Sequence, residues 1–238
     1  MKLDINHLQK KFRKNIFLNE KLSKYSWFNL GGPADIFFRP ESEEQLIDFL
    51  KDLKNMNVKF NILGAGSNTL IRDAGIEGVV IKLGSKFTGV RLLEKDIIEV
   101  GAATLDKKVS DFAKDNNIGK MEFLSCIPGS IGGAVIMNSG CYGSDMSEIL
   151  KSIRVVDFNG LEKEIKSNEI EFYYRGTNLL KEFIILSVVL KGEISLKSEI
   201  EKKQNLLIQK KKDSQPNQIK TGGSTFKNPE NNKAWTLI

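Results

Sequence analysis

Apolar residues in the first half of the chain follow two alternating patterns. In some segments they recur every three or four positions, and in others they form short runs rich in Val, Ile and Phe. Ser42 and Gln45 have the spacing of a capping box at the start of one helical pattern. A second helical pattern begins near Leu105 and ends near Gly119. This half therefore reads as α/β. The runs that predict its strands are residues 34–39, 59–63, 78–83 and 96–100.

The second half of the chain has longer elements. Two strand-like runs flank Asn159 and Gly160, the dipeptide preferred in a type I′ hairpin turn. Residues 183–191 form a strongly apolar run that predicts a strand, and residues 196–212 predict one long helix with its apolar positions on one side. The composition shifts near Gly192, between these two elements, which places a domain boundary between residues 190 and 196.

Composition and charge narrow the class of protein. A chain of 238 residues, 40% hydrophobic and 28% charged, suits one large or two small globular domains. It has no apolar run of the roughly 18 residues needed to cross a bilayer and no apolar signal segment, so we expect a cytoplasmic protein without a membrane partner. The net charge of +6 suits an anionic ligand. The basic residues 210–212 close a helical pattern, so we interpret them as a solvated face and expect no nucleic-acid partner.

Few residues are available for common catalytic arrangements. His7 is the only histidine, which excludes most Ser-His and Cys-His mechanisms and makes us expect no metal site. Cys126 and Cys141 are too few for a disulfide scaffold. We interpret both as reduced, small packing residues, because nothing near them in the sequence predicts a depressed thiol pKa. The chemistry must come from a cofactor or from other polar side chains.

A glycine-rich loop follows residues 59–63, which read as a short buried strand. The loop is GAGSNT, at residues 64–69, and its glycines and small polar side chains could turn hydrogen-bond donors toward a diphosphate. A tight turn that leaves a strand explains the same residues equally well. Leu70 stands where G-x-G-x-x-G has its third glycine, and the loop lacks the lysine of a P-loop. The residues that would line a diphosphate cradle are Gly64, Ala65, Gly66, Ser67, Asn68 and Thr69.

A second glycine cluster occupies residues 127–143 and contains five glycines. Each glycine costs backbone entropy, so a loop laid against a flat or charged ligand is a more economical interpretation than packing. Residues 129–133 lead into a short helix at 134–138, whose first N–H groups would face an anion. Two such loops predict one large dinucleotide between them. Two unrelated tight turns are the alternative.

Five distinctive stretches of sequence follow one another along the chain. They are NLGGPA at 29–34, LGAGSNTLIRD at 63–73, FLSCIPGSIGGAVIMNSGCYG at 123–143, FYYR at 172–175 and GGSTFKNP at 222–229. Together they resemble motifs of the UDP-N-acetylenolpyruvoylglucosamine reductase family, and the resemblance covers about residues 23–238. The last two stretches are not expected in sugar or alcohol oxidases of the same flavin-binding superfamily.

This resemblance implies an α+β fold. It implies an FAD-binding domain of the vanillyl-alcohol-oxidase/p-cresol-methylhydroxylase type, made of two subdomains that divide near residues 80–90. A smaller α+β substrate domain would follow it. We therefore expect an N-terminal segment at residues 1–22, the FAD-binding domain at 23–192 and the substrate domain at 193–238. The protein is expected to be a monomer in the bacterial cytoplasm.

The resemblance also implies a reaction. NADPH would supply a hydride, through non-covalently bound FAD, to the enolpyruvyl ether of a UDP-sugar and so form UDP-N-acetylmuramate for peptidoglycan synthesis. The FAD is expected to be non-covalent because His7 lies outside all five motifs. The cofactor contacts implied besides the GAGSNT loop are Pro128, Gly129, Ser130, Gly132, Gly133, Ala134, Asn138 and Gly140.

Two residues receive catalytic roles from the resemblance. Hydride addition moves negative charge toward the substrate carboxylate, and Arg175 can meet that charge bidentately without losing its proton. The family assigns protonation of the substrate carbon to a serine, here Ser224, with an ammonium group of Lys227 as its neighbour. The implied substrate contacts are Tyr142, Tyr174, Lys227 and Asn228.

Two features depart from the longer family members. Only residues 176–182 separate Arg175 from the next predicted strand, which indicates the shorter form of the family without an inserted lid. Residues 234–238 read as the start of a helix, and the family's later catalytic glutamate has no counterpart. We therefore expect a truncated chain with an incomplete substrate domain. An FAD-binding remnant without turnover and another flavin oxidoreductase of the superfamily are the alternatives.

Overall fold

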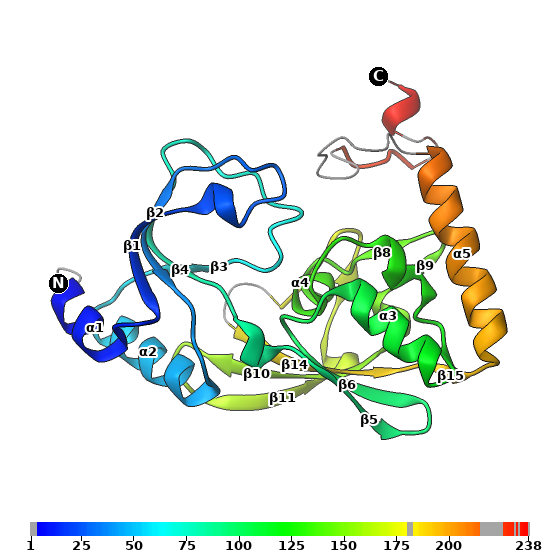
Figure 1. Cartoon of the computed structure of the whole chain (residues 1–238), viewed down its shortest axis with the longest axis horizontal. Coiled ribbons are helices and arrows are strands. Elements are labelled where there is room, and N and C mark those ends of the chain that lie inside the picture. The colour runs from blue at the N-terminus through cyan, green and yellow to red at the C-terminus, as the bar shows by residue number, and fades with distance from the viewer. Residues whose placement is uncertain (1–3, 180–182, 215–225, 231, 233, 238) are drawn as a thin grey trace.

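The computed structural model describes residues 4–179, 183–214, 226–230, 232 and 234–237. Two sheets organise these residues, each with helices packed on it (Figure 1). The first sheet has the strand order β1-β2-β4-β3. β1, Ile16–Lys21, pairs antiparallel with β2, Pro33–Phe38. β4, Ile76–Ile81, is parallel to β2 and to β3, Phe60–Ile62.

Two helices cover one face of the first sheet. They are α1, Ile5–Phe12, and α2, Glu43–Asn55. The predicted cap is confirmed, because the Ser42 side chain accepts a hydrogen bond from the Gln45 N–H group. Side chains alternate along β2, so that one set faces the helices and the other faces the opposite side of the sheet. The helix-facing core contains Leu8, Phe12, Ile36, Phe38, Leu46, Phe49, Leu50, Leu53, Val79 and Ile81.

The second sheet is antiparallel throughout, with the order β11-β10-β14-β6-β5. The strongly apolar run at residues 183–191 is its central strand, as the burial of nearly all its side chains requires. The strands are β5, Val90–Glu94; β6, Ile97–Gly101; β10, Leu150–Asp157; β11, Glu162–Lys166; and β14, Phe183–Lys191.

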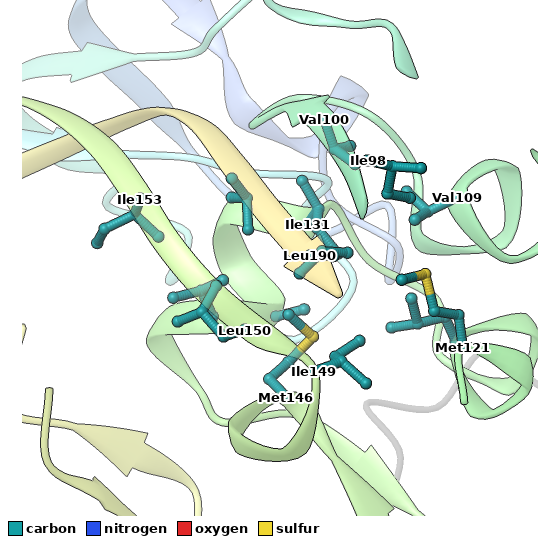
Figure 2. Close-up of a cluster of buried hydrophobic side chains, with 14 of the residues drawn as sticks. Ile98, Val100, Val109, Met121, Ile131, Met146, Ile149, Leu150, Ile153 and Leu190 are labelled. Carbon is teal, nitrogen blue, oxygen red and sulfur yellow. The ribbon is translucent and has the colours of Figure 1, made fainter. Parts of the chain in front are cut away.

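Helices α3, Asp106–Asp115, and α4, Ile131–Ile136, pack with the 3₁₀ helix η3, Glu122–Cys126, on this sheet. Figure 2 shows the resulting core, in which side chains from β6, β10 and β14 meet those of α3 and α4. The long helix α5, Lys197–Ser214, lies across η3 and α3 (Figure 1). Its buried Gln204 donates hydrogen bonds to the Ser110 carbonyl and hydroxyl groups.

Several short elements complete the fold. Each consists of a single turn or a two-residue ladder, and several of them carry residues of the candidate site. The 3₁₀ helices are η1, Leu22–Lys24; η2, Ser85–Phe87; η4, Met146–Glu148; η5, Ser167–Glu169; and η6, Ala234–Thr236. The short strands are β7, Ile118–Gly119; β8, Gly140–Cys141; β9, Ser144–Asp145; β12, Phe172–Tyr173; β13, Gly176–Thr177; and β15, Glu193–Ile194.

Three details differ from the sequence predictions. Strands β1 and β5 were not predicted. Both lie at sheet edges and expose most of their side chains, apolar ones included, so their apolar residues do not alternate regularly with polar ones. Strand β3 is also an edge strand, so the predicted burial of this run is wrong, and Ile62 is exposed. The hairpin at Gly160 is not type I′, because only Gly160 of its loop has a positive φ, of 77°. The Asp157 carboxylate instead fixes the loop by accepting from two backbone N–H groups.

Arg154 joins the two sheets. It lies on β10, and its guanidinium group donates to both carboxylate oxygens of Glu43 at the start of α2, at 2.7 and 2.5 Å. A third hydrogen bond of 2.7 Å reaches Glu162 on β11. The two carboxylates raise the pKa of Arg154, with the Glu43 hydrogen bonds as the main cause. This planar fork holds α2 of the first sheet against the second sheet.

Replacing Arg154 with methionine is expected to lower the free energy of unfolding by about 1–2 kcal/mol, because two carboxylates lose charge-assisted hydrogen bonds at a half-buried position. The urea midpoint measures this. The control is Arg91→Met, since Arg91 also pairs with a carboxylate, that of Glu99, but its side chain is 72% exposed. That variant is expected to lose less than about 0.5 kcal/mol. Equal losses in the two variants would show that the link between the sheets adds nothing.

Candidate active site

The GAGSNT loop begins directly after β3 and rests on the chain between η1 and β2. The Gly66 carbonyl accepts a hydrogen bond of 2.9 Å from the Trp27 N–H group. Gly66 has a φ of 73°, and a Cβ atom at this position would overlap the Tyr25 carbonyl oxygen. Both the backbone conformation and the close approach therefore require glycine here. Gly64 and Asn68 are exposed, so the loop presents backbone and amide groups outward.

Replacing Gly66 with alanine is expected to displace the loop and to weaken flavin binding by at least about tenfold, because the new methyl group meets a backbone carbonyl that cannot rotate away. Gly143→Ala is the matched control. Gly143 also has a positive φ, of 89°, but a Cβ atom there meets nothing within 4 Å. The control costs backbone strain of about 1–2 kcal/mol only. Fluorescence titration with FAD compares them, and equal affinities would contradict the packing of this loop.

The two glycine-rich loops meet in space. A Cβ atom on Gly64 would lie 2.9 Å from the Ser130 hydroxyl oxygen, although the two residues belong to loops far apart in sequence. The Lys82 ammonium group, from the chain just after β4, donates a hydrogen bond to the Gly64 carbonyl. Burial, and secondarily the charge of Arg39, lower the pKa of Lys82. A cation therefore stands at the base of the first loop.

Lys82 was not predicted from the sequence, because a phosphate-binding lysine was expected only within the loop itself. Its only sequence signal is its position at the end of an apolar strand-like run, residues 78–83. Parallel strands β3 and β4 end at the same edge of the sheet, so the residue after β4 lies beside the loop after β3. The pairing of these strands brings the ammonium group to Gly64.

Helix α4 corrects one expectation about anion binding. The short helix was predicted at residues 134–138, with its first N–H groups facing an anion. It begins instead at Ile131, and the N–H groups of Ile131 and Gly132 donate to the carbonyls of Thr104 and Ala102, at 2.9 and 3.0 Å. These bonds dock the helix on the segment between β6 and α3. Gly132 is buried against Ala102, where a Cβ atom would lie 3.1 Å from the Ala102 Cβ atom. Gly133 is exposed on the same turn.

Asp106 lies beneath this second loop. Its side chain is fully buried, and neither carboxylate oxygen has a hydrogen-bond partner among the residues that the structure describes. Burial raises its pKa to about 8. A Cβ atom on Gly129 would lie 2.5 Å from one of its oxygens, so the loop backbone sits directly on the carboxyl group. Asp106 is therefore protonated at neutral pH, and no negative charge lies under the loop at this position.

Arg175 occupies the turn of a small hairpin. Strands β12 and β13 pair with Tyr173 opposite Gly176, so Tyr174 and Arg175 form the two-residue turn. Arg175 has a φ of 65°, a conformation that is unfavourable for a residue with a Cβ atom and that is often found at functional positions. Its guanidinium group lies over the Tyr174 ring, 5.3 Å from the ring centroid, and donates to the Phe226 carbonyl at 3.0 Å.

The hairpin formed by β12 and β13 is hydrogen-bonded to α4, which lies within the second glycine-rich stretch, residues 127–143. The Thr177 hydroxyl group donates to the Ile136 carbonyl, at the end of α4, at 3.3 Å. The Tyr173 hydroxyl group closes the hairpin by donating to the Thr177 carbonyl at 2.6 Å. Arg175 and the second glycine-rich loop therefore belong to one local structure, which the sequence could not establish because residues 144–174 separate them.

The predicted substrate residues lie partly together. The Asn228 N–H group donates to the Tyr174 hydroxyl group at 3.4 Å, while the Asn228 side chain accepts from the Ala234 N–H group. Lys227 is exposed. Tyr142 is exposed at the turn between β8 and β9, with a φ of 57°. Ser224 lies outside the residues that the structure describes.

Two remaining expectations concern cysteines and other site types. Both cysteines pack in the core of the second sheet, as predicted, with Cys126 inside the buried cluster and Cys141 against it. The expectation that neither thiol has a depressed pKa does not hold for Cys126, whose pKa is lowered to about 6, with the neighbouring Cys141 as the main cause. Among the described residues, no group of three or more His, Cys, Asp or Glu side chains could hold a metal ion. No helix in the described part of the chain is long and apolar enough to cross a membrane.

These residues fit a bound dinucleotide. Gly64 and Gly133 expose the backbone of the two loops, Gly64 lies where the loops meet, and Lys82 places a cation at that point. Residues 34–166 match the family described as FAD binding domain. The fold and the site therefore define a flavoprotein, built on the FAD-binding domain of the vanillyl-alcohol-oxidase/p-cresol-methylhydroxylase type.

Sequence relatives identify the family within this class. The chain is 44% identical over 238 residues to UDP-N-acetylenolpyruvoylglucosamine reductase of Pelagibacter ubique, covering 99% of this chain and 78% of the relative. It is 38% identical to the enzyme of that name from Caulobacter vibrioides, covering 95% and 75%. The chain belongs to the UDP-N-acetylenolpyruvoylglucosamine reductase family and is an FAD-dependent oxidoreductase of that family.

Solved structures agree with this assignment. The reductase of Thermus caldophilus superposes with a TM-score of 0.81 at 30% identity, covering 94% of this chain and 77% of that chain. A p-cresol methylhydroxylase superposes with a TM-score of 0.56 at 13% identity, covering 80% and 43%, and shows the shared fold. The fold class and the family predicted from the five motifs are therefore confirmed.

Proposed function

We propose that this chain reduces the enolpyruvyl ether of UDP-N-acetylglucosamine to UDP-N-acetylmuramate, with NADPH as the hydride donor. Bound FAD supplies the hydride chemistry. The observation that carries the proposal is Arg175, held in a left-handed turn beside Tyr174 and tied through Thr177 to the glycine-rich loop. The two relatives named above, both called UDP-N-acetylenolpyruvoylglucosamine reductase and 44% and 38% identical to this chain, support the same activity.

The residues of this chain have different proposed roles in catalysis, cofactor binding and substrate binding. Arg175 stabilises the charge that develops on the substrate carboxylate, and Ser224 delivers a proton to the substrate carbon. Lys82 and the exposed backbone of the two loops hold the cofactor diphosphate. We assign substrate binding to Tyr142, Tyr174, Lys227 and Asn228. Tyr174 contacts Arg175, and Asn228 contacts Tyr174. Lys227 follows Phe226, whose carbonyl accepts a hydrogen bond from Arg175.

The proposed cofactor contacts come from both loops. Those in the first loop are Gly64, Ala65, Gly66, Ser67, Asn68 and Thr69, and those in the second are Pro128, Gly129, Ser130, Gly132, Gly133, Ala134, Asn138 and Gly140. Gly66, Gly132 and Ala134 are buried, so they act by shaping the loops. We further propose a monomeric protein of the bacterial cytoplasm, with residues 193–238 forming part of a substrate domain.

An anaerobic two-step titration tests this function. The purified chain should carry a flavin absorption spectrum that NADPH bleaches, and the enolpyruvyl UDP-sugar should then restore the oxidised spectrum and gain two hydrogens by mass. Bleaching without reoxidation by the sugar would identify an FAD-binding remnant and contradict the proposed activity. Rapid aerobic reoxidation with stoichiometric peroxide release would instead identify a flavin oxidase.

A further inference from the structure

Cys126 and Cys141 stand at the two ends of the second glycine-rich loop. Cys126 is the last residue of η3 and Cys141 is the last residue of β8, and these elements contact each other. The Cys141 thiol donates a hydrogen bond of 3.5 Å to the Phe123 carbonyl in η3. Cys141 packs against the core cluster that contains Cys126, and each thiol shifts the pKa of the other. Residues 127–140 therefore form a loop whose two ends, at Cys126 and Cys141, lie on elements that contact each other.

The surroundings of the pair assign different states to the two sulfur atoms. The hydrogen bond from Cys141 is the main cause that lowers the pKa of Cys126, with Ser125 and the charge of Lys211 as further causes, while burial opposes them. The same hydrogen bond raises the pKa of Cys141. The Lys211 ammonium group, on α5, donates to the Cys126 carbonyl at 2.7 Å. The directions of these pKa shifts mark Cys126 as the more readily ionised of the two thiols, and the thiolate is the form that attacks an oxidant.

Other charged groups near η3 do not cancel this arrangement. Glu122 is the acidic residue of η3, and it is paired with Lys203 of α5 at 3.3 Å. Two lysines of α5 therefore face this element, one neutralising Glu122 and the other bound to the backbone of Cys126. Cys141 is half-buried, which leaves a route from solvent to the pair for a molecule as small as a hydroperoxide.

We propose that Cys126 and Cys141 are a modification site, which forms a reversible intramolecular disulfide with a hydroperoxide as oxidant. The Cys126 thiolate attacks a peroxide oxygen, the O–O bond breaks, and a sulfenic acid forms at Cys126 as hydroxide leaves. The Cys141 sulfur then attacks the Cys126 sulfur, the S–S bond forms, and the hydroxyl group leaves as water. In total the two thiols lose two hydrogens and the peroxide becomes two waters. A small dithiol reverses the reaction.

The disulfide closes residues 127–140 into a ring that carries eight of the proposed cofactor contacts, the loop residues Pro128 to Gly140 named above. A closed ring has fewer open conformations, so the oxidised protein releases FAD more slowly than the reduced protein. This consequence rests on the proposed function, since it requires FAD in this loop. Formation of the disulfide does not, because it depends only on the two thiols.

Mass spectrometry after brief peroxide treatment tests the disulfide. These are the only two cysteines in the chain, so alkylation of the whole protein reports on them alone. Both thiols should disappear together, with a mass loss of two hydrogens, on a single-chain species that dithiothreitol restores. Met137 lies between the cysteines. After cyanogen bromide cleavage at Met137, the two flanking fragments should stay joined until they are reduced.

Two single variants assign the roles of the sulfur atoms. Cys141→Ala should stop at a sulfenic acid on Cys126 that dimedone traps, and Cys126→Ala should leave Cys141 reacting at least about tenfold more slowly. Circular dichroism establishes that both variants fold. Sulfinic acid at Cys126 without a disulfide in the unmodified chain, an intermolecular disulfide, or equal reaction rates of Cys141 with and without Cys126 would each overturn the proposal.

The effect on the loop is measured separately, by comparing FAD dissociation from oxidised and reduced protein. We expect release from the oxidised protein to be at least about threefold slower, and dithiothreitol to restore the faster rate. Equal rates in a chain that binds FAD and has the disulfide would overturn the effect on the loop. A chain that forms the disulfide but binds no FAD would instead overturn the proposed function and leave the modification site standing.

Discussion

Replacing Arg175 with glycine is expected to reduce turnover by about two to three orders of magnitude while leaving FAD binding unchanged. One fixed charge at a developing oxyanion contributes a factor of this size in enzymes that use such groups. Arg175 lies in a left-handed turn, with a φ of 65°, where glycine is the least strained residue. The variant should therefore fold at least as well as the original chain, and the loss of rate cannot come from misfolding.

The measurement separates the two half-reactions. NADPH should bleach the flavin of Arg175→Gly at the original rate, whereas reoxidation by the enolpyruvyl substrate should be slow. Arg175→Lys should recover only part of the rate, because an ammonium group cannot bind a carboxylate bidentately. Arg91→Gly, at an exposed arginine on β5, serves as the control and should turn over normally. If Arg175→Gly reoxidises within threefold of the original rate, Arg175 is not the catalytic cation.

Asp106→Asn is expected to remove the loss of stability that the raised pKa of Asp106 predicts as the pH rises from about 4 to 8. The carboxyl group has a pKa of about 8 in the folded protein, well above its ordinary value, because it is fully buried. In that window the folded chain keeps a proton that the unfolded chain releases. Stability therefore falls with rising pH and levels off above about pH 8.

The size of this effect follows from the shift. Each pKa unit corresponds to roughly 1.4 kcal/mol, so a shift of about four units costs on the order of 5 kcal/mol above pH 8. Asparagine has nearly the same shape and does not ionise. The free energy of unfolding of Asp106→Asn should match that of the original chain near pH 4 and exceed it by several kcal/mol at pH 9.

Urea unfolding across this pH range provides the data. Asp111→Asn, on the more exposed part of the same helix α3, is the control and should run parallel to the original chain. Parallel curves for Asp106→Asn and the original chain would show that Asp106 is ionised in the folded protein. The carboxyl group would then need a partner that the structure does not contain.

Local sequence signals account for much of the fold. The capped helix at Ser42 and the strand at residues 183–191 follow from patterns in which the type of each residue indicates whether its side chain is buried. The signals miss the edge strands β1 and β5, since an edge strand shows little or no alternation between a buried and an exposed face. They predict the edge strand β3 correctly but overstate its burial. The hairpin at Gly160 fails for another reason. The Asp157 carboxylate selects the turn through side-chain hydrogen bonds that the dipeptide preference ignores.

The candidate site also has some features that the sequence predicts and others that it does not. The two glycine-rich loops and Arg175 are visible in the sequence, because unusual residues in a fixed order are a local property and resemble a known family. Lys82, Asp106 and the state of Cys126 are not visible. Each depends on groups distant in sequence: on Gly64 for Lys82, on the enclosing core for Asp106, and on Cys141 and Lys211 for Cys126.

The sequence by itself determined the family, the cofactor class and the residues that could carry the reaction. Only the tertiary structure decided which of them act together. Contact between the loops at Gly64 and Ser130 depends on how two sheets pack. The raised pKa of Asp106 depends on its burial, and the lowered pKa of Cys126 depends on neighbours that the fold supplies. Motif chemistry is local along the chain, whereas desolvation and electrostatic interaction act through space, which is why only the folded chain reveals them.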